Sequence, residues 1–326
     1  MVCPGGGVVF GAHSMTSTII GALLPLVVVL FFGFLAGWRH HFDGKDASTL
    51  NRMVMLYAFP LSLFVNIMSV SRASLASQLP MAAAIFLSMV ISFSAAILVI
   101  RYVFQRTLAE ATLQGVAIGA AAVPFVGSAI LPNLFGPATS AVAISSAGFA
   151  MNLVQTPVCM ILLTIATVQS TPKKGGGFLT YVISAFKEPI VWAPLLATAL
   201  VMANVRLPTH IASAFNLLGI TTAGVALFAS GVVLYSCKVI VNLPVVITVC
   251  FRNLVIPALC WGVLIMLGMP KDVIREAVIA LSIPVGTIVV IFSVRFKVVE
   301  QEMASSLFFS TILSVFTMAF FIVATR

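Results

Sequence analysis

The sequence is poor in charge. Asp, Glu, Lys and Arg make up 8% of its 326 residues, and only eight of these are acidic, whereas 61% of all residues are hydrophobic. A water-soluble domain of this length could not bury so much apolar surface. Because the apolar residues form long runs and not short alternating strands, the sequence predicts an all-α polytopic membrane protein rather than a β-barrel.

Cysteines and catalytic motifs are also scarce. The five cysteines are scattered without a C-x-x-C pair, which indicates packing residues rather than a disulfide framework or a metal site. The sequence has no H-E-x-x-H or G-x-S-x-G motif, so zinc-protease and serine-hydrolase chemistry lack their residues. We therefore expect no enzyme, no cofactor and no metal.

Apolar windows of about 20 residues predict ten transmembrane spans. The first five lie at 17–38, 52–70, 79–104, 111–131 and 137–168, and the second five at 189–206, 211–235, 241–268, 273–294 and 305–325. They define a first half (17–168), a linker (169–188) and a second half (189–326). Residues 1–14 lack the basic n-region of a signal peptide, so we do not interpret them as one. Residues 1–16 are interpreted instead as an N-terminal leader, with Met15 as the alternative start.

Basic residues outnumber acidic ones and give a net charge of +9. They lie mostly in short connections between spans, where they orient helices, so binding to nucleic acid is not indicated. Eleven of the seventeen follow spans one, three, five, seven and nine, and five lie on the opposite side. This asymmetry predicts a multi-pass cell-membrane protein with a cytoplasmic linker and both termini on the non-cytoplasmic side.

The two halves of the sequence repeat each other. Three pairs keep one offset of 164 residues: Pro25 with Pro189, FPLSLF (59–64) with AGVALF (223–228), and LPMAAAIF (79–86) with LPVVITVC (243–250). Since each half holds an odd number of spans, the second half must enter the membrane from the opposite face. The sequence thus predicts two inverted five-helix repeats, the architecture of secondary transporters.

Each half carries a proline in the middle of its fourth span. AAAVPFVGSAILPNLFG (120–136) contains Pro124, and ALSIPVGTIVVIF (280–292) contains Pro284 in span nine. A helix broken at membrane depth frees N–H and C=O groups that only protein or a water-filled cavity can satisfy. Two repeat-related breaks that meet at the midplane present half-helix N-termini to an anion, whereas isolated proline kinks are the simpler alternative.

Acidic side chains are missing from the centres of the predicted spans. By this span assignment each lies in a loop or in the terminal turns of a span: Asp43, Asp46, Glu110, Glu188, Asp272, Glu276, Glu300 and Glu302. Ion-coupled carriers often keep a carboxylate at the midplane as a proton relay or sodium ligand. We therefore expect no buried Asp–Asp cation exchanger, and any coupling to use neutral oxygens or the substrate's own proton.

Arg252 is the one charge near the centre of a span, span eight. A lone Arg there should face the bundle interior and find a partner. Its guanidinium either holds a substrate carboxylate through two parallel hydrogen bonds or caps backbone carbonyls freed by a nearby break. The sequence leaves both roles open.

Polar and small residues near the breaks complete the candidate site. Ser128 and Thr287 lie beside the two breaks, Asn152 lies in span five, and Gly127 and Gly286 are expected to allow close backbone approach. Membrane helices also use such polar residues to hold neighbouring helices together, which is the alternative for each of them. The same alternatives apply to three further polar candidates, Asn66, Gln155 and Asn253.

Beyond these patterns, the chain resembles the auxin efflux carrier family from residue 15 onward. The similar segments are ALLPLVVVLFFGFLAG (22–37), LNRMVMLYAFPLSLF (50–64) and LLGITTAGVALFASGVVL (217–234), together with the paired crossovers. The resemblance implies ten helices in which helices 1, 2, 6 and 7 form a scaffold. It also implies that helices 3–5 and 8–10 move as an elevator-like transport unit, with broken helices four and nine crossing at the anion site.

Within that family, the chain looks most similar to bacterial malonate carriers, on KEPIVWAPLLA (187–197), LVIPALCWGVLIMLG (254–268) and SVRF (293–296). Arg252 stands five positions before Pro257, as a basic residue does in the malonate-type relatives. Span four departs from the family pattern Asn-x-x-x-x-Gly-x-Pro. Gly127 fits this pattern, but Ala129 replaces the proline and no Asn precedes it.

We therefore predict a secondary carrier in the lipid bilayer for a small organic anion, such as the dicarboxylates malonate or malate. The alternatives are an efflux carrier for an aromatic carboxylate of the auxin type and an anion channel, and a homodimer is left open. The predicted substrate-binding residues are Pro124, Gly127, Ser128, Asn152, Arg252, Pro284, Gly286 and Thr287.

Overall fold

The computed structural model describes residues 12–69, 79–169, 189–203, 205, 207–237 and 239–325. Most of the leader and nearly all of the 169–188 linker lie outside the described residues. Within these ranges the secondary structure is helical, apart from one isolated β-bridge. The all-α prediction is confirmed for the described part of the chain.

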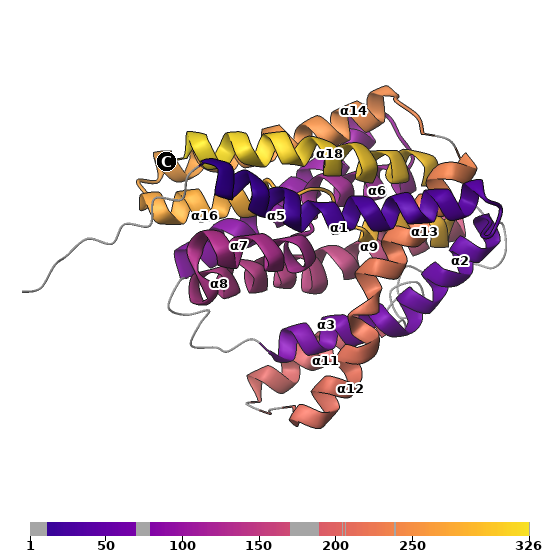
Figure 1. The fold of residues 1–326 in the computed structure, drawn as a ribbon, viewed down its shortest axis with the longest axis horizontal. Coiled ribbons are helices and arrows are strands. Elements are labelled where there is room, and N and C mark those ends of the chain that lie inside the picture. Colours follow the sequence, from indigo (N-terminus) through magenta and orange to yellow (C-terminus); the bar gives the residue numbers. More distant parts are fainter. Residues whose placement is uncertain are drawn as a thin grey trace, which may run out of the picture.

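Helices of the first half follow one another with short connections (Figure 1). They are α1 (Ala12–Trp38), α2 (Gly44–Met53), α3 (Phe59–Met68), α5 (Leu79–Tyr102), α6 (Leu108–Gly119), α7 (Ser128–Phe135), α8 (Pro137–Phe149) and α9 (Thr156–Gln169). The second half contains α11 (Pro189–Met202), α12 (Thr209–Gly219), α13 (Thr221–Cys237), α14 (Leu243–Cys250), α15 (Ile256–Met266), α16 (Lys271–Leu281), α17 (Ile288–Phe296) and α18 (Glu300–Ala324).

Six stretches of the described chain are long and apolar enough to cross a membrane. They are Gly44–Met68, Leu79–Tyr102, Val142–Thr167, Thr209–Ser236, Leu243–Met266 and Glu300–Ala324, and they coincide with predicted spans two, three, five, seven, eight and ten. Predicted span one lies within α1 (Ala12–Trp38), a continuous helix of 27 residues, and predicted span six corresponds to a shorter apolar helix, Val191–Met202. Predicted spans four and nine are each divided into two helices, which is why neither reaches the length of a continuous span.

Prolines explain the local widening of three helices. Three π-helical segments of the described chain, η1 (Val54–Ala58), η3 (Ala150–Gln155) and η4 (Phe251–Val255), are each followed within two residues by a proline: Pro60, Pro157 and Pro257. Proline has no N–H for the carbonyl four residues earlier, and its ring clashes with that carbonyl. In each case the carbonyl belongs to the π segment, whose wider turn accommodates the ring.

Glycines allow α1 to lie directly against α13 (Figure 1). A Cβ atom on Gly33 would lie 2.0 Å from the backbone oxygen of Phe228, and one on Gly231 would lie 2.1 Å from that of Leu30. Helices in membranes gain little from hydrophobic exclusion, so close packing through small residues holds them together. Across the molecule α3 packs against α11 and α12, a group seen at the lower edge of Figure 1.

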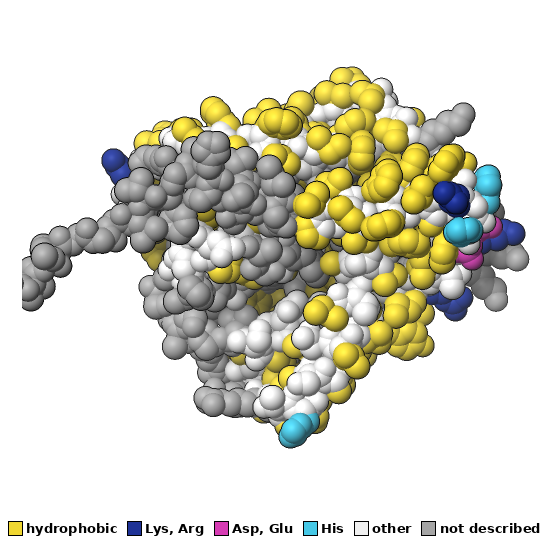
Figure 2. Space-filling model, in the orientation of Figure 1, with side chains coloured by type: hydrophobic (Ala, Val, Ile, Leu, Met, Phe, Trp, Pro, Cys, Tyr) yellow, Lys and Arg dark blue, Asp and Glu magenta, His cyan; other side chains and the backbone are white. Residues whose placement is uncertain are grey.

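Much of the described surface that faces the viewer in Figure 2 is apolar, and most of its charged side chains lie at one end. Figure 2 shows hydrophobic side chains over much of the visible face, with Lys, Arg, His and acidic side chains gathered where α1 leads into α2. Large apolar side chains such as Leu98 and Phe316 are more than half exposed. At the charged end, the side chain of Asp43 caps α2, and hydrogen bonds from the N–H groups of Asp46 and Lys45 lower the pKa of Asp43. A lipid bilayer accounts for the exposure of so many large apolar side chains.

Candidate functional site

Two helices are interrupted in the interior of the bundle. The first breaks after α6 and resumes as the short π-helical segment η2 (Val123–Gly127), which continues into α7. The second breaks between α16 and α17. Of the two predicted helix breakers, Pro284 lies in the second interruption, and Pro124 is the second residue of η2, directly after the first.

The two interrupted segments meet as an antiparallel β-bridge between Ala121 and Val285, called here the crossover. Two backbone hydrogen bonds close it: Ala122 N–H to Pro284 C=O at 3.0 Å, and Gly286 N–H to Ala120 C=O at 3.1 Å. Non-helical backbone is tolerated at membrane depth only where protein or water satisfies its polar groups. Here each interruption donates one backbone hydrogen bond to a carbonyl of the other.

Arg252 satisfies further carbonyls of the crossover. It is fully buried in η4, and its guanidinium donates to the backbone oxygens of Ile118 at 3.0 Å and Ile283 at 3.3 Å, and to that of Leu281. These oxygens lie at the C-terminal ends of α6 and α16, where the helix dipole is negative and favours a cation. Of the two roles left open by the sequence, the structure gives Arg252 the contacts of the capping role.

Gln155 performs a similar task from η3. Its Nε2 donates to the carbonyl of Gly119 at 3.1 Å and to that of Met89 at 2.9 Å. The amide therefore links the end of α6 to the neighbouring α5. Gln155 was only a secondary polar candidate in the sequence, because nothing local indicates which carbonyl a buried amide will meet.

Ser310 and Asn253 support the other interruption. The hydroxyl of Ser310, on α18, accepts the N–H of Val285 at 3.0 Å and donates to Asn253 Oδ1 at 2.6 Å. Asn253 Nδ2 in turn donates to the backbone oxygen of Ser310 at 2.8 Å. The sequence reasoning missed Ser310, since a single serine in an apolar helix carries no signal of its partner.

A cavity of about 90 Å³ lies on one side of the crossover, beside Pro124. Asn152, which is 1% exposed, contributes an amide whose Oδ1 has no hydrogen-bond partner. Polar groups on a cavity wall suit a small polar ligand or water. The lining comes from α3 and its C-cap, η2, α8 and η3: Asn66, Ile67, Ser69, Pro124, Ile144, Ser145, Gly148, Phe149 and Asn152.

A second cavity lies beside Pro284 and is nearly closed, with about 10 Å³ of space. Thr287 lies on its wall, and so does Thr311 of α18. The remaining lining is apolar and comes from η2 and the residue before it, from α13, from the segment between α16 and α17, and from α18: Ala122, Val126, Ala223, Leu227, Val285 and Leu307. The predicted binding residues are therefore divided, with Pro124 and Asn152 on the larger cavity and Pro284 and Thr287 on the smaller.

The other predicted residues take different places. Gly127 is closely packed, since a Cβ there would lie 2.9 Å from Val123 Cγ1. Close approach does not explain Gly286, where the nearest atom to an added Cβ would be 3.5 Å away, an ordinary contact. Ser128 begins α7, but its side chain lies outside the described part of the structure.

The structure buries one acidic residue near the start of span nine. Glu276 lies in the second turn of α16, which begins at Lys271, and is 2% exposed. Its Oε1 has no hydrogen-bond partner. The sequence did not indicate this burial, because α16 is amphipathic and packs against several helices, which a hydropathy window cannot reveal.

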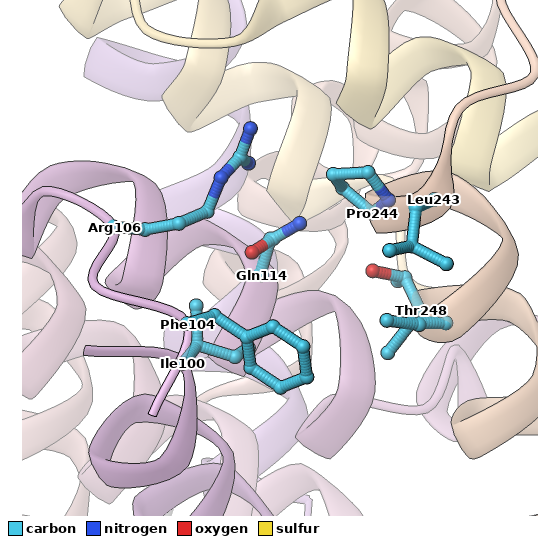
Figure 3. Close-up of a pocket in the computed structure, with 8 residues that line it drawn as sticks. Ile100, Phe104, Arg106, Gln114, Leu243, Pro244 and Thr248 are labelled. Carbon is cyan, nitrogen blue, oxygen red and sulfur yellow. The ribbon is translucent and has the colours of Figure 1, made fainter. Parts of the chain in front are cut away.

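A third cavity, of about 120 Å³, lies away from the crossover between the α5–α6 connection and α14 (Figure 3). Gln114 and Thr248 extend into it from opposite walls, and Thr248 Oγ1 has no hydrogen-bond partner. Beside it Arg106 donates to both carboxylate oxygens of Glu302, at 2.7 and 2.9 Å, which raises the pKa of Arg106. Asn242 also donates to Glu302, so these contacts join the α5–α6 connection to α14 and α18.

Comparison with known proteins identifies the family of this chain. A family described as "Membrane transport protein" matches residues 18–322, nearly the whole chain. The chain belongs to this family. It is also similar to proteins named "Uncharacterized transporter YfdV" from Escherichia coli strain K12, Escherichia coli O157:H7 and Shigella flexneri. Each is 28% identical over 317 residues, which cover 96% of this chain and 99% of the relative.

Family membership makes the chain a multi-pass membrane transporter and not an enzyme. It also confirms the resemblance to the auxin efflux carrier and membrane transport family.

Proposed function

We propose that this protein is a secondary carrier for a small organic anion, with malonate and malate as the first candidates. Transport proceeds by elevator-type alternating access around the crossover, in a cell membrane with both termini on the non-cytoplasmic side. The observation that carries the proposal is the Ala121–Val285 bridge, which joins two interrupted helices inside the bundle. Paired interruptions of this kind hold substrate near the midplane of secondary transporters.

The helix N-termini at the crossover favour an anion. The first N–H groups of a helix have no partner within it, and the helix dipole gives them partial positive charge. The segment that starts at Val123 and the helix that starts at Ile288 both begin at the crossover. A carboxylate beside Pro124 would accept hydrogen bonds from such donors and from Asn152.

Helix packing supports the inverted repeat. In the first half α1 packs against α13 of the second, and α11 of the second half packs against α3 of the first. Exchanging the two halves, with α1 for α11 and α3 for α13, converts one pair into the other. Together with the constant sequence offset, this reciprocity supports ten helices in two inverted repeats, with scaffold helices 1, 2, 6 and 7.

The two cavities support alternating access. In an inverted repeat the cavities beside Pro124 and Pro284 are counterparts, but their volumes are about 90 and 10 Å³. Such inequality is expected when one side of the crossover is accessible and the other is closed. If each repeat adopted the conformation that the other has here, the cavity beside Pro284 would open and the cavity beside Pro124 would close.

Uptake by the purified protein in proteoliposomes tests the proposal. Asn152→Ala should reduce uptake of labelled malonate by about tenfold, since a hydrogen bond to a charged group contributes about 1.5–3 kcal/mol. Asn216→Ala, an exposed change on α12, serves as the matched control. Unchanged uptake by the Asn152 variant would remove the larger cavity from the pathway.

The alternatives have their own readouts in the same vesicles. Competition by indole acids would indicate an aromatic carboxylate of the auxin type, although the small cavity favours a smaller substrate. Unitary currents in a planar bilayer would indicate a channel. The homodimer stays a prediction, which light scattering of the detergent-solubilised protein tests.

A further inference from the structure

A carboxylate with one unpaired oxygen is buried in one of the two interrupted helices. Glu276 is 2% exposed and lies in the middle of α16, five residues from Lys271 and five from Leu281. At 1.5 Å per residue it is roughly 8 Å along the axis from either end of the helix. One of its oxygens, Oε1, is sealed from solvent without a hydrogen bond.

No counter-ion compensates this carboxylate among the described residues. The salt bridges found there all involve Arg106, and Glu302 is bound by it. The guanidinium of Arg275, next to Glu276 in the chain, lies 5.7 Å from the ring centre of Phe135. The titratable groups on α16 and on the elements packed against it (α5, α7, α8, α15, α18 and η2) are Lys271, Asp272, Arg275, Arg101, Tyr102, Cys260, Glu300 and Glu302.

Burial without a counter-ion favours the neutral acid. An ionised carboxylate removed from water loses its hydration, and only a close cation or several donors can replace it. Among the described residues no cation pairs with Glu276, and its Oε1 accepts no hydrogen bond, so this surrounding favours the protonated side chain. Release of that proton requires water or a cation to reach α16, which means a change in the packing around it.

Glu276 is mechanically connected to the proposed anion site. Arg252 donates hydrogen bonds to the carbonyl of Leu281, the last residue of α16, and to that of Ile283, two residues after it. Arg252 has no counter-ion among the described residues, and its hydrogen bonds to these carbonyls join it to the end of α16. A change in the packing of α16 on proton release would therefore reach the carbonyls that Arg252 holds.

We propose that Glu276 is a proton-binding site that couples the movement of the anion to the movement of one proton in the same direction. A proton passes from solvent to the carboxylate on one side of the membrane and returns to solvent on the other. By linkage, protonation of Glu276 raises anion affinity and anion binding favours protonation. The proposal rests on the carrier function proposed above and names its coupling ion.

Two measurements on the full chain in proteoliposomes test the proposal, and the first needs no substrate. Infrared difference spectra recorded across a pH titration should contain the C=O band of a protonated carboxyl, shifted in D₂O. The band should be lost in Glu276→Gln, retained in Asp272→Asn, a matched exposed acid of α16, and moved in frequency in Glu276→Asp. Absence of a band that depends on residue 276 would overturn the proposal.

The second measurement separates coupling from transport. A gradient of one pH unit drives up to about tenfold accumulation when one proton accompanies each anion. Wild type and Asp272→Asn should accumulate labelled malonate in this way, whereas Glu276→Gln should exchange internal for external malonate but reach a ratio of about one. Accumulation by the Gln variant equal to wild type would refute proton coupling through Glu276.

The two measurements fail independently. If wild type does not transport malonate, the proposed substrate is wrong, while the infrared band still decides whether Glu276 binds a proton. If Glu276→Gln is not recovered as a folded protein, Glu276→Asp carries both measurements. In that variant an unshifted band and an unshifted pH dependence of accumulation would count against the site.

Discussion

Replacement of Arg252 tests whether the crossover depends on a guanidinium cap. Arg252 is fully buried and donates to three backbone oxygens, those of Ile118, Leu281 and Ile283. Arg252→Ala leaves these oxygens without their partner, at a cost of about 1–3 kcal/mol each, or roughly 3–9 kcal/mol in total. The same change removes a charge whose burial in a membrane helix costs about 2.5–3.5 kcal/mol.

The net expectation is a destabilisation of about 3 kcal/mol, because lost hydrogen bonds outweigh the relieved desolvation. A shift of about 2 °C per kcal/mol for a large domain gives a fall in Tm of roughly 6 °C. Thermal unfolding of the detergent-solubilised protein, followed by intrinsic fluorescence or light scattering, measures this shift. Arg52→Ala, an exposed change on α2, should leave Tm within about 1 °C as a control.

Arg252→Lys distinguishes the cap from a simple positive charge. An ammonium on a flexible stem keeps the charge and its desolvation cost but lacks the planar fork that reaches three separate carbonyls. We therefore expect Arg252→Lys to lose at least as much Tm as Arg252→Ala. If Arg252→Lys retains both the Tm and the malonate uptake of wild type, the capping argument is refuted and the charge alone matters.

Two further predictions concern packing. Gly33→Ala should destabilise the protein by about 1–3 kcal/mol, because its Cβ would meet the Phe228 backbone oxygen at 2.0 Å. The control Gly262→Ala, whose Cβ would have nothing within 4 Å, should be neutral or slightly stabilising in the same thermal assay. A double-mutant cycle of Arg106→Gln and Glu302→Gln should give a coupling of about 1 kcal/mol, since the pair is bidentate but partly exposed. Additive effects of those two changes would mean that the contacts do not hold the α5–α6 connection to α18.

Much of the fold could be predicted because its causes are local. Apolar runs located the helices, and the chemistry of proline located both interruptions, since a missing N–H acts on its own segment wherever the segment lies. The π-helical segments before Pro60, Pro157 and Pro257 follow from the same chemistry, although the sequence reasoning did not identify them. The structure covers predicted span one with the continuous α1, whereas it interrupts predicted spans four and nine and gives span six a shorter apolar helix.

The candidate site was predictable only in part. The neighbourhood of Pro124 and Asn152 was identified, yet the sequence grouped them with Pro284 and Thr287, which line a separate cavity. Gly286 was expected to permit a close approach that the packing does not require. Distances between residues on different helices depend on helix rotation and tilt, which hydropathy does not encode.

By itself, then, the amino-acid sequence determined that the chain is helical and apolar and where two of its helices break, and it predicts that its halves correspond. These properties depend on single residues and their immediate neighbours. Only the tertiary structure decided that Arg252 caps the crossover, that the Pro124 cavity is the larger, and that Glu276 is buried with one oxygen unpaired. Each of these depends on which surfaces meet when the helices pack, and a buried polar group acquires its role from whatever it then faces.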